Sequence, residues 1–105
     1  METLNLFING ELVPAVSGKT REIECPADQE VHTHASDAGT EDVVAAIASA
    51  RAKFDSGEWP RKTVGVRADI LRSVADRLVA DKAEVARHES LDTGKTFAGV
   101  GRRRR

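Results

Sequence analysis

The sequence VHTHASDAGTEDVVAAIASARAKF (residues 31–54) decides the fold, because the spacing of its apolar residues changes along it. In residues 31–36 the side chains alternate with a period of two, which is typical of a β-strand. After Thr40 the spacing becomes that of an α-helix, about 3.6 residues per turn. The apolar stripe of this helix consists of Val43, Ile47, Ala50 and Phe54. A strand that leads directly into a helix predicts the α/β class.

The residues before this stretch predict strands. In residues 4–15 two short apolar runs flank Asn9 and Gly10, and this pair favours a hairpin because both residues tolerate positive φ. Pro14 restricts the second strand to an edge or an end, since proline has no N–H for a sheet. Residues 20–25 add a further half-exposed strand around Ile23.

The residues after this stretch predict helices. Thr40 is placed to cap the first helix, and Thr63 is placed to cap a second. The second stripe consists of Val66, Ile70, Leu71, Val74 and Leu78. Asp81 and Glu84 have the spacing of a capping box, which predicts a third helix or a kink. That helix is expected to run to about Leu91, with Gly94 ending it in a left-handed conformation.

The fold class is therefore α/β: an N-terminal β-hairpin and strands, followed by two to three helices. With 105 residues the chain is one domain or less. Strands followed by helices suit a small α+β domain and also the front end of a larger α/β protein. Composition and periodicity leave both alternatives open.

Charge and cysteine content narrow the location and the partners. The net charge is −1, but residues 102–105 are four arginines, and without them the net charge would be −5. Four arginines without interleaved aromatic residues give little support for nucleic-acid binding. One cysteine, no charged-then-apolar leader and no apolar run near the ~18 residues of a membrane span predict a cytoplasmic protein without a membrane partner.

The chemically reactive residues do not assemble into an active site. Cys25 precedes a proline and has no activating base nearby, so we interpret it as structural. His32 and His34 have metal-capable spacing on one strand face, but no Cys or carboxylate completes a tetrahedral set, which favours a solvated polar face. A Gly-Lys-Thr triplet begins at Gly94, yet the position where a phosphate loop needs its first glycine is Glu89.

Four stretches, taken in order, resemble a known family. They are LFINGELVPAVSGKT (6–20), IECPADQEV (23–31), DVVAAIASARAKFDSGEWPR (42–61) and RADILRSVADRLVADKAEVARHESLDTGKTF (67–97). Together they resemble the N-terminal part of an NAD(P)-dependent aldehyde dehydrogenase, whose landmarks are F-I-N-G-E-W, N-P-A-T-G-E, A-A-x-A-F-D-x-G-x-W and E-x-x-D-x-G-K-P. The resemblance covers residues 4–97 and is closest to the betaine and hydroxymuconic semialdehyde branches.

The sequence departs from these landmarks at three places. Cys25 stands where the family usually has Asn, Asp28 and Gln29 replace its Thr-Gly turn, and Thr96 replaces a proline. The first two changes fall in one turn. The third lies next to residue 97, where we expect the resemblance to end.

The resemblance implies the fold of the front part of the cofactor domain, and NAD or NADP as the cofactor. In the family a cysteine thiolate attacks the aldehyde, hydride passes to the nicotinamide, and a glutamate activates water. These motifs and the cofactor loop do not occur in the 105 residues, and Cys25 does not match the nucleophile motif. No catalytic or cofactor-binding residue is therefore assigned.

We accordingly predict a truncated N-terminal segment (residues 1–97) that is inactive alone, followed by a basic tail (98–105) outside the family sequence. The alternative is a small non-enzymatic α/β protein that binds a partner through exposed helix faces. That partner would be a full-length dehydrogenase homologue or a second copy of the chain.

The resemblance also implies one ion site. Many family members bind a monovalent cation through backbone carbonyls and a carboxylate, and oxygen ligands suit a hard cation. The corresponding positions are the carbonyls of Ile23 and Glu24 and the carboxylate of Asp92. A competing interpretation is that Asp92 caps or braces the turn at Gly94.

Overall fold

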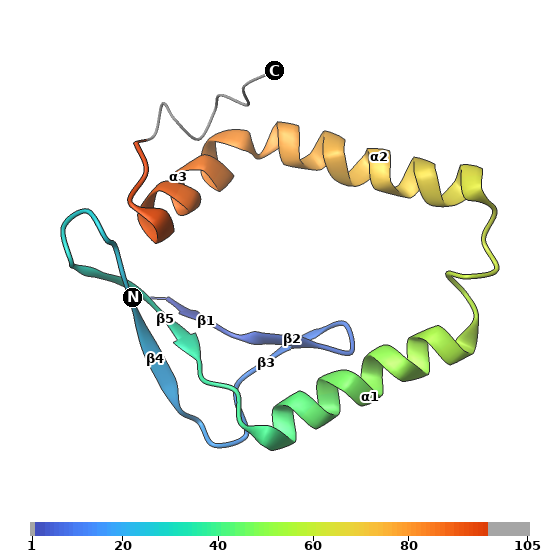
Figure 1. Cartoon of the computed structure of the whole chain (residues 1–105), viewed down its shortest axis with the longest axis horizontal. Helices are drawn as coiled ribbons and strands as arrows, with labels where there is room; N and C mark the ends of the chain where they lie inside the picture. The colour runs from blue at the N-terminus through green and yellow to red at the C-terminus, as the bar shows by residue number, and fades with distance from the viewer. Residues whose placement is uncertain (1, 97–105) are drawn as a thin grey trace. The chain divides into compact units, whose positions relative to one another are not determined.

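The structure is a computed structural model and describes residues 2–96. The predicted tail, residues 98–105, lies outside this range. The chain divides into two compact units, Met1–Glu22 with Thr33–Thr63, and Ile23–His32 with Val64–Arg105. The described residues form these elements in chain order (Figure 1): β1 (Thr3–Leu4), β2 (Leu6–Ile8), β3 (Glu11–Val13), β4 (Thr20–Glu24), β5 (Val31–Ser36), α1 (Thr40–Ser56), α2 (Val64–Ala80) and α3 (Lys82–Thr93).

The first unit contains the predicted hairpin. Strands β2 and β3 pair antiparallel, with Ile8 opposite Glu11, so that only Asn9 and Gly10 form the turn. Their φ angles are 53° and 82°, the left-handed values that a two-residue hairpin of this kind requires. The hairpin prediction is confirmed, and helix α1 contacts strand β2 (Figure 1).

A second, three-stranded sheet has the order β1-β5-β4. Strand β1 runs parallel to β5, with Thr3 opposite His34 and Leu4 opposite Ala35. The turn from β4 to β5 is closed by two main-chain hydrogen bonds, from Cys25 N–H to the Glu30 carbonyl and from Gln29 N–H to the Cys25 carbonyl. Gln29 adopts a φ of 62° in this turn.

The three helices follow, with corrections to their ends. The cap of α1 is Gly39 rather than Thr40, because the Asp42 carboxylate accepts the Gly39 N–H and so starts the helix one residue earlier. Helix α1 ends at Gly57, whose left-handed backbone donates an N–H to the Phe54 carbonyl.

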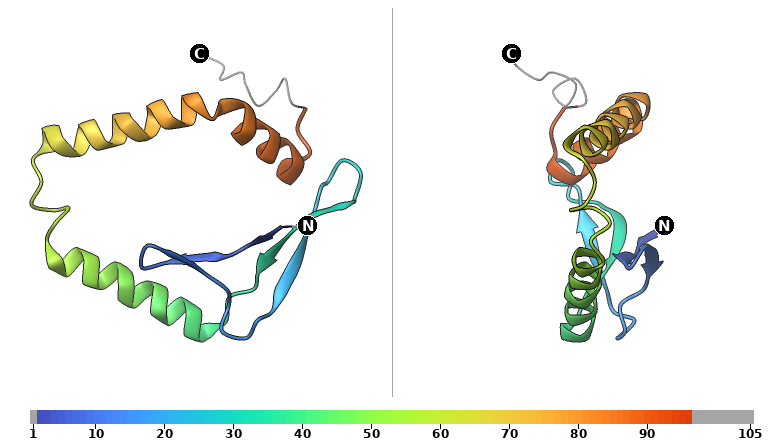
Figure 2. Two further views of the ribbon diagram at one scale, coloured as in Figure 1. Left: turned by 180° about the vertical axis from the view of Figure 1, so that it is seen from behind. Right: turned by 90° about the vertical axis from the view of Figure 1, so that its right-hand side faces the viewer.

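Helix α2 begins directly after Thr63. The chain changes direction between α2 and α3 (Figure 2), and Asp81 lies between the two helices. Asp81 is the residue before α3, as predicted, but its carboxylate binds Arg77 Nε at 2.7 Å and makes no capping hydrogen bond. Gly94 ends α3 with a φ of 69°, as predicted, although the helix extends to Thr93 rather than Leu91.

Little of this chain is buried. The buried apolar residues of the described part are Ala15, Cys25 and Ala86, and no large side chain there is fully buried. The stripes of α1 and α2 are exposed instead, including Ile47 at 64% and Phe54 at 63%. Within residues 2–96, no helix combines the length and the apolar character needed to cross a membrane.

Candidate functional site

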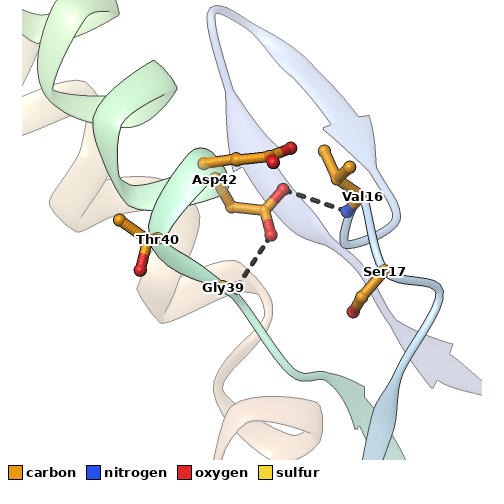
Figure 3. A pocket seen from close by; sticks show the side chains of 6 residues that line it. Val16, Ser17, Gly39, Thr40 and Asp42 are labelled. Carbon is orange, nitrogen blue, oxygen red and sulfur yellow. Dashed lines mark hydrogen bonds between the residues drawn. The ribbon is translucent and has the colours of Figure 1, made fainter.

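The best-defined polar site of the first unit lies where α1 begins (Figure 3). The Asp42 side chain is only 5% exposed although it is a carboxylate. Its Oδ1 accepts the Val16 N–H at 3.1 Å, and its Oδ2 accepts the Gly39 N–H at 2.9 Å. Asp42 therefore connects the chain that follows β3 to the first turn of α1.

A hollow of about 300 Å³ adjoins this residue, and it is lined by Val16, Ser17, Gly39, Thr40, Glu41 and Asp42 (Figure 3). A helix N-terminus ordinarily attracts anions. Here Glu41 and Asp42 place negative charge at that end, and both Asp42 oxygens already accept main-chain hydrogen bonds. This hollow does not suit a cofactor phosphate, and Asp42 acts as a structural bracket.

The residues of the predicted cation site belong to the second unit. Ile23 and Glu24 end strand β4, and Asp92 lies in the last turn of α3. The described side-chain contact of Asp92 is with His32, since Asp92 Oδ1 lies 3.2 Å from His32 Nε2. That nitrogen is buried and makes no hydrogen bond with any described residue, so the two groups lie close together without a hydrogen bond.

His32 is the neighbour of Asp92 that sequence reasoning missed. It was expected on a solvated face, but its side chain is only 14% exposed. His34 is also partly buried and lies 4.0 Å from Glu22. The alternation of residues 31–36 places both histidines on one face of the strand. It cannot show that Asp92, which lies far along the chain in α3, contacts His32.

The contact with His32 limits which Asp92 oxygen could bind a cation. A hard cation takes oxygen ligands, and one Asp92 oxygen is already beside His32, which leaves Oδ2 for an ion. Within residues 2–96 no three His, Cys, Asp or Glu side chains gather as a metal cluster. A site built from the Ile23 and Glu24 carbonyls would not depend on such a cluster, and it stays a prediction.

The competing interpretation is that Asp92 braces the turn at Gly94. In the structure the hydrogen bonds of this turn are made by Ser90. The Gly94 N–H donates to the Ser90 carbonyl at 2.9 Å, and the Ser90 hydroxyl donates to the Lys95 carbonyl. Asp92 faces His32 instead. Ser90 therefore closes this turn.

Cys25 has a structural environment. Its side chain is buried, and both of its main-chain groups are engaged in the turn between β4 and β5. A nucleophilic cysteine needs access to its substrate and an activating group. The structure thus agrees with the interpretation of Cys25 as a structural residue.

Comparison with known proteins identifies the family. A sequence model described as "Aldehyde dehydrogenase family" matches residues 12–102. The match ends inside the predicted tail, and the boundary at residue 97 stays a prediction. The chain is 44% identical over 92 residues to aldehyde dehydrogenase 1 of Tanacetum cinerariifolium, covering 88% of this chain and 18% of that protein. It is 43% identical to betaine aldehyde dehydrogenase of Bacillus subtilis (strain 168), with coverage of 88% and 19%.

A solved structure agrees in fold. Betaine aldehyde dehydrogenase from Staphylococcus aureus, in complex with NAD+, superposes with a TM-score of 0.89 at 38% identity, covering 92% of this chain and 19% of that one. The chain thus spans about a fifth of the length of the relatives that it matches. Its fold is similar to that of the matching part of this enzyme. This chain belongs to the aldehyde dehydrogenase family.

Proposed function

We propose that this chain forms the N-terminal framework of an NAD(P)-dependent aldehyde dehydrogenase and does not oxidise aldehydes by itself. The observation that carries the proposal is the exposure of its helix stripes. A fold that matches a fifth of a larger enzyme presents Val43, Ile47 and Phe54 to solvent, at 49%, 64% and 63% exposure. Apolar surface of this kind normally marks a contact with further protein.

The chain's own residues support the absence of catalysis. Oxidation of an aldehyde through a covalent intermediate needs an accessible nucleophile and a base in hydrogen-bond reach. The single cysteine, Cys25, is buried in a turn. Both oxygens of the buried carboxylate Asp42 accept hydrogen bonds from main-chain N–H groups. When bound, NAD would accept the hydride from the substrate, and the related S. aureus enzyme was solved with NAD+. No residue described here is assigned to hold it.

Complementation tests the framework role. The partner is B. subtilis betaine aldehyde dehydrogenase expressed without the region that this chain matches. Adding this chain is expected to restore NAD reduction with betaine aldehyde, because the exposed stripes regain their covering protein. A chain carrying Ile47→Asp and Phe54→Asp places two charges on that surface and is expected to restore none.

The control for that experiment is Ala48→Asp, since Ala48 is also exposed on α1 but lies outside the stripe. It is expected to restore activity like the unmodified chain. Equal failure of all three chains would count against the framework role, whereas equal success would show that α1 is not the contact surface.

A second candidate function rests on the same exposed stripes. The chain would then be a non-enzymatic binding protein whose partner is a full-length dehydrogenase or a second copy. Light scattering of the purified chain, with and without the intact B. subtilis enzyme, separates the two partners. A monomer that leaves the mass of the enzyme unchanged excludes both.

We also propose that a monovalent cation binds to the Ile23 and Glu24 carbonyls and the Asp92 carboxylate. The proposed location of the protein is the cytoplasm. Potassium or sodium is expected to raise the free energy of unfolding relative to choline at equal ionic strength, because a bound ion stabilises the folded state. Asp92→Asn should abolish this increase, and Asp76→Asn, an exposed carboxylate on α2, should keep it. An increase that survives Asp92→Asn would contradict the assignment.

A further inference from the structure

The tip of the β2–β3 hairpin combines three features that together make it chemically reactive. Asn9 and Gly10 are both exposed, and they form the whole turn between paired strands. No heavy atom lies within 4 Å of the position where a Cβ of Gly10 would be, so the main chain is open on that side. The N–H of Gly10 has no hydrogen-bond partner among the described residues.

We propose that Asn9 is a site of spontaneous deamidation, a modification that is independent of the framework role. In this reaction the Gly10 nitrogen gives its proton to solvent and bonds to the Asn9 side-chain carbon, Cγ. The Cγ–Nδ2 bond breaks, and the amide leaves as ammonia after taking up a proton. A five-membered imide remains, and one water molecule opens it.

Two products follow, and neither needs an oxidant or a reductant. When water breaks the new bond between Cγ and the Gly10 nitrogen, residue 9 becomes aspartate with an ordinary main chain. When water breaks the original peptide bond, the chain continues through Cγ and residue 9 becomes isoaspartate. Glycine as the second residue favours ring closure because it has no Cβ to obstruct the attacking nitrogen.

The chain offers an internal control, since Asn5 is its only other asparagine. Asn5 is followed by Leu6, whose side chain hinders the attacking nitrogen. The Asn5 Oδ1 atom also accepts a hydrogen bond from the Ser36 hydroxyl at 3.2 Å, which holds the side chain in place. Asn5 is therefore expected to persist while Asn9 reacts.

The surroundings of the hairpin tip decide what the products do. Asn9 and Gly10 line a hollow of about 290 Å³ together with Lys53 of α1. A new carboxylate at residue 9 would line this hollow together with Lys53, and aspartate tolerates the left-handed conformation that Asn9 adopts. Isoaspartate adds a methylene to the main chain of a two-residue turn, which disrupts the pairing of Ile8 with Glu11.

Peptide mass spectrometry of the whole chain during incubation at mildly alkaline pH tests the proposal. We expect residue 9 to gain the mass difference between an amide and an acid at least about tenfold faster than residue 5, with both aspartate and isoaspartate present. The variant Asn9→Gly retains a turn-forming pair and is expected to show no such product.

A second measurement follows the same reaction in the unfolded chain. The chain unfolded in urea should deamidate at Asn9 as well, because the reaction depends on the Asn-Gly sequence. Reaction at Asn9 only in urea would show that the folded turn protects the amide and would overturn the proposal. Equal rates at residues 5 and 9 in the folded chain would overturn it too.

Discussion

Asp42 has the most specific polar contacts in the first unit. Its carboxylate is buried and accepts the N–H groups of Val16 and Gly39, one with each oxygen. Removing the carboxylate leaves both donors without this partner. We expect Asp42→Ala to lower the free energy of unfolding by about 1–3 kcal/mol in urea titrations followed by circular dichroism.

Glu41 provides the control for Asp42. It also lies in the first turn of α1 and carries the same charge, but it is exposed. Glu41→Ala should cost no more than about 0.5 kcal/mol. Equal losses for the two variants would show that the helix dipole, rather than the two hydrogen bonds, accounts for the effect of Asp42.

Gly94 combines a backbone requirement with a close contact. Its φ is 69°, and a Cβ added there would lie 3.2 Å from Pro26 Cβ and 3.4 Å from the Ala27 nitrogen. Gly94→Ala should therefore cost about 1–2 kcal/mol for the left-handed backbone and about 1 kcal/mol more for crowding.

The matched comparison for Gly94 is Gly18. Its φ is 68°, but open space surrounds the position of its Cβ. Gly18→Ala should show the backbone cost alone, measured by the same urea titration. If the two variants lose equal stability, α3 does not pack on the turn at Pro26 as the structure has it.

At the scale of the elements, the apolar stripe of α1 is the feature with the clearest consequence. Ile47 is 64% exposed, so replacing it removes few contacts within the chain. Ile47→Gln should change the free energy of unfolding by no more than about 0.5 kcal/mol and should lower self-association, measured by light scattering across a concentration series. Ala48→Gln, on the same helix, should leave self-association unchanged. A large loss of stability in Ile47→Gln would mean that the stripe is part of an internal core.

Local signals explain which elements could be predicted from the sequence. The hairpin at Asn9-Gly10 and the end of α3 at Gly94 depend on residues whose own backbone preferences set the turn, and both are found. Gln29 shows the limit of such reasoning, because it takes a φ of 62° without being a residue that favours it. There the two hydrogen bonds between Cys25 and its partners in the turn fix the backbone.

Contacts between distant segments explain what the sequence could not predict. The bracket from Asp42 to Val16 and the pairing of Asp92 with His32 both join residues far apart in the chain. Neither has a local signature, because the partners Val16 and His32 come from segments far from the two carboxylates in the sequence. The predicted cation residues Ile23, Glu24 and Asp92 could be named only through the family resemblance, and the structure adds His32 to their surroundings.

The helices carry exposed apolar stripes, and few apolar residues of the described chain are buried. Val66, Ile70 and Leu78 repeat with helical spacing and are all exposed. Periodicity alone predicts that such a stripe is covered. The covering surface is not found among residues 2–96, and the relatives of the chain are about five times longer.

We infer that this chain has the family's fold but does not oxidise aldehydes by itself. The most direct test is NAD reduction by the purified chain in the presence of betaine aldehyde, followed by the absorbance of the reduced nicotinamide. Cys25→Ala serves as the control, because it removes the only thiol of the chain. We expect no reduction above buffer for either protein. Reduction that depends on the chain and disappears in Cys25→Ala would contradict it.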